Sequence, residues 1–468
     1  MEFRNLTPFP AIAFDSLDQR DITFHTVVMR LTFELQDDGQ LTFASAQTPL
    51  ADTDVYFGEL NQSSVREESD FAPYKPHTDV IVNAHACAPR SEPASRFRVG
   101  IKIDDQPESL VLPPPPQGLS PLQSPSHEDM QAWRLQVERL KKDGPPIPVI
   151  IDKQLNVTGP RSWKKRYLLT RALSLFSLPA WKLSQPEKMT SCPLRYEYAY
   201  GGDNKVLVNE RAAKRVPKKN RIPGMEPASA SDNWPSENDV PAIAHTAYVR
   251  NTVGKGYADS WYLRAKKCRQ LPAPQIESLN QRISKFGKHY EPQGFGFIAR
   301  AWQPRLMLAG TYDQQWLDHR HPDLPADFDF AYWNGAPADQ QITPYLDGAE
   351  TVTLTNLCPA GTPGSVEDKE GNTQLKLKLP GHLPFILVRF QEGQLGELAA
   401  RLDTLMIDAI PESGQDTQKI KVICIWRATI AAQPEVRVLE ARMIARDDLV
   451  RLRAQPFAAA ANTAVAPV

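Results

Sequence analysis

Short runs of β-branched and aliphatic residues, many alternating with polar residues, dominate the pattern along the chain. Two such runs within residues 22–45 flank the tripeptide at 37–39 (DDG), whose turn chemistry closes a β-hairpin. Half-buried strands show this alternation because successive side chains point to opposite faces of a sheet. The pattern predicts further strands over residues 79–86, 97–103, 148–157, 350–357, 374–379, 385–390, 421–430 and 435–443.

Helical patterning is sparse. Residues 126–129 (SHED) resemble a capping box, and Leu135, Val137 and Leu140 recur among charged residues over 130–142, which predicts one amphipathic helix. We therefore expect a predominantly β protein, α+β with few helices. Its antiparallel sheets should form sandwich-like or barrel-like layers, joined by long irregular loops rich in aromatic residues, Gly and Pro.

Composition shifts along the chain predict its division into regions. A proline run at 113–116 should be extended and semi-rigid, and residues 203–240 should be irregular because they are polar and rich in Pro, Ser, Asn and Lys. We expect an N-terminal β-rich region (1–103), a Pro-rich linker with one amphipathic helix (104–147), a central irregular aromatic-rich β region (148–345), a C-terminal β-rich region (346–456) and a flexible tail (457–468).

Residues 290–337 form the most unusual segment of the chain. They hold ten of its 40 aromatic residues, interleaved with Gly, Pro and Asp. Prolines at 292, 304, 322, 325 and 337 are incompatible with an ordinary amphipathic helix, because each lacks a backbone donor and clashes with the preceding turn. Large rings bury enough apolar area to order an irregular backbone. We expect a rigid recognition or scaffolding surface with most of the rings inside.

Overall charge and targeting signals narrow the possible partners. Lys and Arg total 54 against 55 Asp and Glu, so no global field attracts nucleic acid or anionic membrane. The five cysteines are scattered without CxxC pairs, which fits a reducing compartment. The N-terminus lacks the basic start and apolar core of a signal peptide, and no apolar run approaches the length of a membrane span. We expect a soluble, cytoplasmic protein without nucleic-acid or membrane partners.

The most tempting chemistry lies between residues 313 and 329. If the backbone is extended there, His319 and His321 point to one face, and imidazole with carboxylate ligands can bind Zn, Mn or Fe. Asp near Pro is also the usual chemistry of turns, so surface and turn roles compete with a metal site. The carboxylates concerned are Asp313, Asp318, Asp323, Asp327 and Asp329. We assign no catalytic, cofactor-binding or metal-binding residue.

Other motifs fail as catalytic signatures. Residues 294–296 (GFG) lack the third glycine of a dinucleotide fingerprint, and residues 254–256 (GKG) lack the flanking residues of a phosphate loop. His85 and Cys87 share one face of a predicted strand, where a buried structural thiol competes with a Cys-His nucleophile. The basic run between 211 and 221 is interpreted as a solvated loop in preference to a partner-binding patch.

Two further clusters are interpreted as structural. The acidic residues at 66–70 (REESD) precede a proline-bounded extended segment, and we expect them to pair with Arg66 or Lys75 to hold an irregular loop. Tyr196, Tyr198 and Tyr200 alternate along the chain, so they are expected to share one face of a strand that ends in a glycine turn. Core or interface stacking is favoured there over a ligand-binding role.

Many uncommon short phrases occur in an order that resembles a known family. They are residues 5–10 (NLTPFP), 66–70 (REESD), 75–80 (KPHTDV), 159–163 (GPRSW), 196–202 (YEYAYGG), 293–296 (QGFG), 302–305 (WQPR), 309–313 (AGTYD) with Trp316, 324–329 (LPADFD), 334–337 (NGAP) with Asp339 and Gln340, 403–405 (DTL) and 426–427 (WR). Together they span nearly the whole chain. They resemble a bacterial family of unknown-function domains encoded beside type VI secretion genes. Thr252 replaces an expected Pro and Gln275 an expected Asn, both at turns.

The resemblance implies a non-enzymatic accessory protein with no established catalytic residues and no cofactor. Such a protein acts in the cytoplasm as an adaptor or chaperone for a toxin effector that carries a PAAR-type spike-tip domain, and it assists loading onto the VgrG spike. Two alternatives remain open from the residues themselves: a metal-dependent hydrolase that uses His319, His321 and nearby Asp residues, and a carbohydrate-binding module that uses Trp and Tyr platforms.

Overall fold

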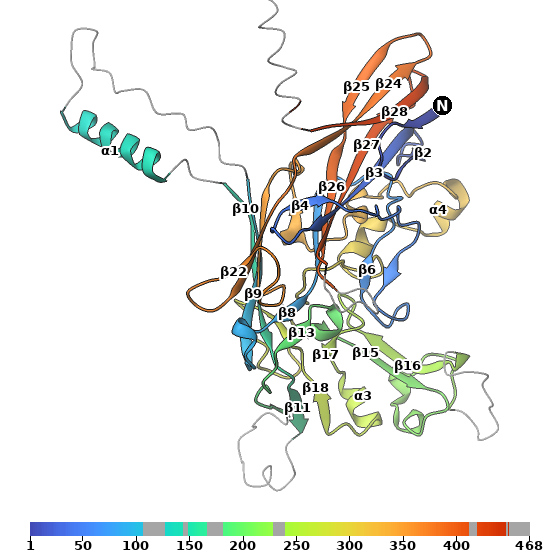
Figure 1. Cartoon of the computed structure of the whole chain (residues 1–468). Coiled ribbons are helices and arrows are strands. Elements are labelled where there is room, and N and C mark those ends of the chain that lie inside the picture. The colour runs from blue at the N-terminus through green and yellow to red at the C-terminus, as the bar shows by residue number, and fades with distance from the viewer. Residues whose placement is uncertain are drawn as a thin grey trace, which may run out of the picture.

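The computed structural model describes residues 1–105, 127–143, 148–165, 181–227, 239–410, 419–445 and 448. The described chain is predominantly β, with several mostly antiparallel sheets and few helices (Figure 1), as the sequence predicts. The sequence leaves sandwich-like and barrel-like sheets as alternatives. The described residues match the first, because their sheets are open and form no closed barrel. The predicted tail and most of the predicted linker lie outside the described residues.

The central sheet has seven strands drawn from distant parts of the sequence. Among the described residues, its only parallel pair is β26 with β7, and β4 pairs with β3 beside the main path. In spatial order the strands are β2 (Ala11–Leu17), β3 (Thr23–Leu35), β27 (Lys421–Ala431), β26 (Arg401–Asp408), β7 (Thr78–Asn83) and β20 (Gln341–Ile342), with β4 at Leu41–Phe43.

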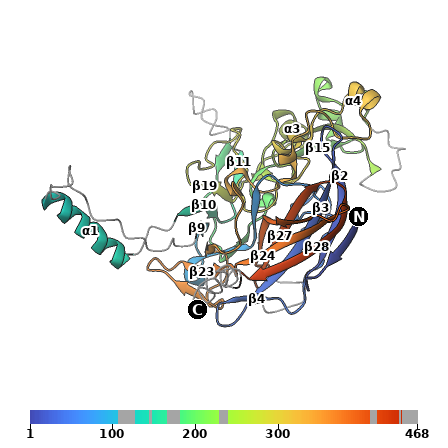
Figure 2. The same cartoon turned by 90° about the horizontal axis from the view of Figure 1, so that it is seen from above.

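Two further sheets lie against one face of the seven-stranded sheet. The first has the order β19 (Ile276–Ser278), β10 (Val149–Thr158), β9 (Arg96–Asp104), β21 (Thr351–Thr355), β23 (Thr373–Lys378) and β22 (Ser365–Glu367). The second has the order β1 (Glu2–Asn5), β28 (Val436–Ala445), β24 (His382–Phe390) and β25 (Leu395–Ala399). Seen from above, β9 and β10 lie to the left of the group formed by β3, β27, β24 and β28 (Figure 2).

Smaller elements complete the molecule. Short sheets pair β12 (Trp181–Leu183), β11 (Ser162–Lys165) and β18 (Gln270–Pro272); β13 (Ser191–Pro193) and β8 (His85–Cys87); β14 (Tyr200–Gly201) and β17 (Lys255–Gly256); β15 (Asp203–Leu207) and β16 (Ala242–Ala247); and β5 (Val55–Tyr56) and β6 (Val65–Glu67). The α-helices are α1 (His127–Asp143), α3 (Ser260–Ala265) and α4 (Gln314–His319). The 3-10 turns are η1 (Pro89–Ser91), η2 (Tyr196–Tyr198), η3 (Ala213–Arg215), η4 (Lys218–Asn220), η6 (Arg305–Ala309), η7 (Phe330–Trp333) and η8 (Ala338–Gln340). Within the described ranges, no helix is long and apolar enough to cross a membrane.

Strand β3 explains how the core is built, because both of its faces are buried. Val27, Met29 and Leu31 point into the main hydrophobic core, which they share with residues of the six-stranded and four-stranded sheets. The intervening residues, including Val28 and Arg30, point to the opposite face of the seven-stranded sheet. A strand covered on both sides carries few exposed polar positions, which accounts for its continuous run of buried residues.

The predicted strands and hairpin are confirmed. Each predicted strand segment contains an observed strand, β3 and β4 form the hairpin around the turn at 37–39, and α1 coincides with the predicted helix. Two predictions are wrong. Tyr196–Tyr198 is a 3-10 turn, so the tyrosines do not share a strand face; Tyr196 and Tyr200 are nevertheless buried. Residues 203–207 form β15 inside a zone predicted to be irregular, because they pair with β16.

The aromatic segment is ordered, but only half of its rings are buried. Five rings are inside: Tyr290, Phe295, Phe297, Trp302 and Phe328. Tyr312 is exposed, and the remaining four are partly exposed, so the expectation that most rings lie inside is too strong. The Trp302 ring lies edge-on to Tyr196 at 5.4 Å between centroids, and its Nε1 donates to Thr252 Oγ1 at 3.1 Å.

Truncating the two tryptophans of this segment should separate a core role from a surface role. Trp302 is 4% exposed, so Trp302→Ala should lower the free energy of unfolding by about 3–5 kcal/mol. Trp316 is partly exposed, so Trp316→Ala should cost clearly less. Denaturant unfolding of both variants tests this difference. Equal losses would mean that burial of Trp302 does not set its contribution.

Candidate functional site

Two irregular segments cover the second face of the seven-stranded sheet. These covering segments are residues 44–77 and 291–340. Val65 from the first segment joins Phe297 and Ala336 from the second in one apolar cluster with residues of the sheet. The sheet members of that cluster are Val28, Ile81, Met406, Ile423 and Ile425. Irregular backbone at this depth needs partners for its polar groups, and charged side chains supply many of them.

Two arginines that project from the sheet hold the first covering segment. Arg30 on β3 is fully buried; its Nη1 donates to Asp70 at 2.9 Å, and it pairs with Glu67. Burial alone lowers the pKa of the Arg30 guanidinium, but the two carboxylates outweigh burial and raise it. Arg427 on β27 pairs with Asp403 and donates to the backbone carbonyls of Asp70 and Ala72.

A second group of ionic contacts holds the other covering segment. Arg305 of η6 pairs with Glu68, with 2.9 Å between Nη2 and Oε2, and its other donors reach backbone carbonyls of the same segment. Asp79 on β7 accepts from Asn334 Nδ2 at 3.0 Å and from two backbone N–H groups that follow it. The two covering segments are therefore joined to each other as well as to the sheet.

We call this set of buried or partly buried charges the ionic clamp. Its members are Arg30, Lys75, Arg305, Arg427, Glu67, Glu68, Asp70, Asp79 and Asp403. The pairing predicted from sequence is wrong for the acidic cluster at 66–70. Arg66 instead pairs with Asp408 at 2.8 Å, and Lys75 pairs with Asp79 at 3.0 Å. Several phrases that carry the family resemblance supply clamp residues, including 66–70, 75–80, 302–305, 403–405 and 426–427.

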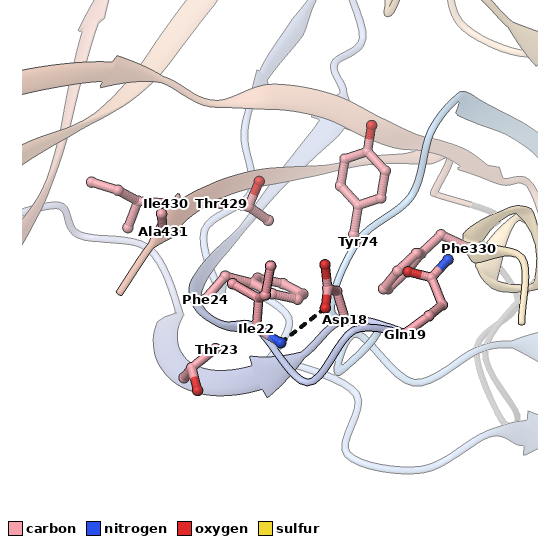
Figure 3. A pocket seen from close by; sticks show the side chains of 10 residues that line it. All are labelled: Asp18, Gln19, Ile22, Thr23, Phe24, Tyr74, Phe330, Thr429, Ile430 and Ala431. Carbon is pink, nitrogen blue, oxygen red and sulfur yellow. Dashed lines mark hydrogen bonds between the residues drawn. The ribbon is translucent and has the colours of Figure 1, made fainter. Parts of the chain in front are cut away.

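An apolar pocket of about 310 Å³ opens between the two covering segments and one end of the sheet (Figure 3). The pocket is formed by the β2–β3 turn, the start of β3, the end of β27 and one ring from each covering segment. Its lining residues are Asp18, Gln19, Ile22, Thr23, Phe24, Tyr74, Phe330, Thr429, Ile430 and Ala431. The Tyr74 and Phe330 rings meet edge-on, with centroids 5.8 Å apart.

Hydrogen bonds on every side fix the walls of the pocket. Thr26 Oγ1 donates to the carbonyl of Pro73 at 2.9 Å, next to Tyr74. Gln19 Nε2 donates to the carbonyl of Phe328 at 2.9 Å, which ties the β2–β3 turn to the second covering segment. Arg320 donates to the carbonyl of Gln19 at 2.9 Å and so connects α4 to the same turn. A pocket whose walls are already fixed loses little conformational entropy when it binds a ligand.

The polar groups of the pocket are engaged in turn structure. Asp18 accepts from the backbone N–H of Ile22 at 2.9 Å and of Arg20 at 2.8 Å. These hydrogen bonds lower the pKa of the Asp18 carboxyl, and the bond from the Ile22 N–H has the largest effect. Asp18 therefore stays ionised. Ile22 itself is 51% exposed, and Tyr74 is also exposed at the mouth. The arrangement suits contact with an apolar group of a partner more than acid–base chemistry.

The residues of the metal hypothesis lie on and around α4. His319 ends this short helix and His321 follows it, so the two do not lie on an extended strand. Asp313 caps the helix by accepting from Trp316 N at 2.9 Å, and Asp327 accepts from Thr311 N at 2.9 Å. Asp329 caps η7 in the same way. In the part of the chain that the structure describes, no group of three or more His, Cys, Asp or Glu side chains is placed to hold a metal ion.

The other sequence motifs occupy structural positions. His85 and Cys87 both lie on β8, where burial raises the pKa of the Cys87 thiol to about 11 and disfavours the thiolate. Phe295 is fully buried between the two glycines of its motif. Lys255 lies over the Tyr198 ring, 4.1 Å from its centroid. In the basic run, Arg215 donates to the carbonyl of Ala265 at 2.7 Å, while Lys218 and Lys219 are exposed.

The sequence indicates only one wall of the pocket in advance. Phe330 belongs to the aromatic segment, but Phe24, Tyr74 and Ile430 come from three other regions that meet only in the fold. A local signal exists for Tyr74, which lies between two prolines in an extended segment. The strand residues carried no signal, because an aromatic or aliphatic residue in a strand is ordinary.

Breaking the clamp at one point should be costly. Arg305→Met removes the cation that bonds buried Glu68 directly and leaves only Arg300, 3.9 Å away, so we expect a loss of about 3–5 kcal/mol in the free energy of unfolding. Arg90→Met is the matched control, since Arg90 pairs with Glu367 at 3.1 Å on the surface and should cost less than about 1 kcal/mol. Denaturant titration measures both, and a small loss for Arg305→Met would refute the structural role of the clamp.

The two histidines near α4 should be dispensable for folding. Both are exposed, so His319→Ala and His321→Ala should each change the free energy of unfolding by less than about 0.5 kcal/mol. Thermal melting tests stability, and elemental analysis of the purified proteins tests for bound metal. Stoichiometric metal in the wild type that disappears in either variant would restore the hydrolase hypothesis.

Comparison with known proteins places the chain in a family. Neither the curated proteins nor the solved structures contain a match. A family described as an uncharacterized protein conserved in bacteria (DUF2169) matches residues 20–112 and 122–427. The matched residues include the clamp, both covering segments and half of the residues that line the pocket. Since the match extends over far more than half of the sequence, the chain belongs to the bacterial family DUF2169.

Proposed function

We propose that this protein is a non-enzymatic adaptor or chaperone of type VI secretion. In this proposal it binds a toxin effector that carries a PAAR-type domain, in the cytoplasm, and assists the stability of the toxin or its loading onto the VgrG spike. The family resemblance motivates the biological setting. The observation that carries a binding function is the apolar pocket between Tyr74 and Phe330, with walls held by hydrogen bonds to three separate elements.

The shape and chemistry of the pocket favour a protein ligand. In protein interfaces, a large side chain of one partner often enters an apolar cavity of the other and anchors the complex. A few such anchor residues supply most of the binding free energy. Ile22 and Tyr74, which line the pocket, are exposed. Tyr312 and Leu317 are exposed at and beside α4, the helix that Arg320 connects to the β2–β3 turn. The near-zero net charge provides no strong long-range attraction, so affinity should rest on these apolar contacts.

The two alternatives receive less support from the described geometry. The aspartates of the hydrolase hypothesis include Asp313, Asp327 and Asp329, which accept backbone N–H groups at turns and helix caps. A carbohydrate reader needs exposed aromatic platforms, and Tyr312 is the ring in the aromatic segment that is most exposed. No second observation favours a sugar there, so we retain the adaptor as the proposed function.

A rim substitution tests the adaptor at the pocket. Ile22→Asp places a charge at the mouth, and it should weaken the complex with the toxin of the same locus at least tenfold while leaving folding intact, because Ile22 is exposed. Leu395→Asp on β25 is the control, since Leu395 is also exposed, at 63%, but lies in another sheet. Co-purification and titration calorimetry measure the complex, which should bury on the order of 1,200–2,000 Å² and tolerate moderate salt.

Deletion in the native cell tests the biological role. Cells without the protein should lose delivery of one toxin, through instability or failed loading, while the secretion machine still fires with other cargo. Normal stability and delivery of that toxin would contradict the adaptor proposal. Intact binding by Ile22→Asp would contradict only the assignment of the pocket.

A further inference from the structure

Lys153 occupies an unexpected position on β10. Along this strand Ile151, Leu155 and Val157 point into the main hydrophobic core, and Lys153 falls on the same face between them. Its side chain is only 7% exposed. Lysine is rarely buried, because its charged end must lose water, and such violations of the local pattern concentrate at functional sites.

Two neighbouring residues of η8 hold the amine. Lys153 Nζ lies 2.7 Å from Asp339 Oδ1 and 2.7 Å from Gln340 Oε1. Gln340 is fully buried, and its own Nε2 donates to the carbonyls of Val80 and Phe295, so its position is fixed. Asp339 differs, because its side chain is 60% exposed and can move away into solvent.

Lys153 is also one of the residues that line a cavity of about 330 Å³, which is large enough for a small metabolite. Tyr196, Ile298 and three prolines contribute apolar walls. Arg250 lies at the same cavity and pairs with Glu291 at 2.6 Å, an exposed contact that a competing anion can replace. The cavity is therefore lined both by a buried lysine and by an arginine whose anionic partner can be exchanged.

Lys75 shows what a purely structural buried lysine looks like in this protein. Its ammonium bonds Asp79 at 3.0 Å and Thr404 at 2.9 Å, and Asp79 is fully buried and fixed by Asn334. Lys75 lies within the ionic clamp and lines none of the described pockets. Lys153, in contrast, has a solvent-exposed carboxylate as its ionic partner and faces a cavity.

Burial also changes the acidity of Lys153. Loss of water around the ammonium lowers its pKa, and the opposing effect of Asp339 is too small to cancel this. A larger fraction of neutral amine is therefore present near neutral pH than for a lysine in water. The neutral amine is the form that attacks carbonyl carbon.

We propose that Lys153 is a covalent binding site for a small aldehyde or ketone that carries a carboxylate, which Arg250 binds. The ammonium gives a proton to Asp339, and the free amine attacks the carbonyl carbon to form a carbinolamine, in which a proton of the amine has moved to the carbonyl oxygen. The carbinolamine loses its hydroxyl as water, with a proton returned by Asp339, and leaves a protonated imine. No oxidant or reductant is required. This site is separate from the apolar pocket, so its failure leaves the proposed adaptor function untouched.

Reductive trapping of the full-length protein tests the site. Glyoxylate is the anionic probe and acetaldehyde the neutral one. Each is added with cyanoborohydride, which reduces a protonated imine in preference to the free aldehyde and gives a stable secondary amine that peptide mass mapping locates. We expect glyoxylate to label Lys153 at least fivefold faster than exposed Lys164 and Lys376 and than buried Lys75. The labelling of Lys153 should also begin at a lower pH than that of the exposed lysines, as its lowered pKa requires.

Variants separate the two parts of the proposal. Arg250→Gln should reduce labelling of Lys153 by glyoxylate several-fold but leave labelling by acetaldehyde unchanged, because only glyoxylate carries a carboxylate. Equal effects on the two probes would overturn the role of Arg250. Labelling of Lys153 no faster than that of Lys164 with either probe would overturn the covalent site, and this measurement on the wild-type protein does not depend on any variant folding.

Discussion

The burial of three guanidinium groups controls how this fold is closed. Arg30, Arg305 and Arg427 lie where a second layer of apolar side chains would normally cover the sheet. A buried cation is tolerated only when a carboxylate pairs with it. Arg30 and Arg305 find their carboxylates in the first covering segment, whereas Arg427 pairs with Asp403 of β26 and donates to backbone carbonyls of that covering segment. The segments, in turn, contain too little regular structure to satisfy their own backbone. Each side of the contact therefore requires the other.

This arrangement has a direct effect on the apolar pocket. Its Tyr74 wall follows the stretch whose carbonyls accept from Arg427, and its Phe330 wall lies in the segment held by Arg305. The pocket is thus shaped by charges that do not line it. An interface built in this way gains specificity from fixed geometry, because a partner must match a cavity that does not adapt.

The sequence predicts local structure well where periodicity and turn chemistry act alone. The hairpin at β3 and β4, the helix α1 and the long strands β9, β10 and β27 are of this kind. It does not predict β26, although this strand is buried in the middle of the sheet. It also does not predict the partners of Glu67, Glu68 and Asp70. Those partners are arginines on β3 and η6, and Arg305 is more than two hundred residues away from Glu68. The pairing of charges is set by tertiary contacts, and spacing along the chain contains no information about them. The same limit applies to the pocket, whose lining residues come from both ends of the protein.

The seven-stranded sheet also determines when the protein can fold during synthesis. Strand β3 pairs on one side with β27, some four hundred residues later, and β7 pairs in parallel with β26. Until the ribosome has released the last part of the chain, β3 and β7 have unpaired edges and an uncovered core face. Contacts of such long sequence separation are slow to form, and exposed strand edges invite pairing with other chains. A protein proposed to protect another polypeptide must itself remain unassembled until nearly all of its own chain has been made.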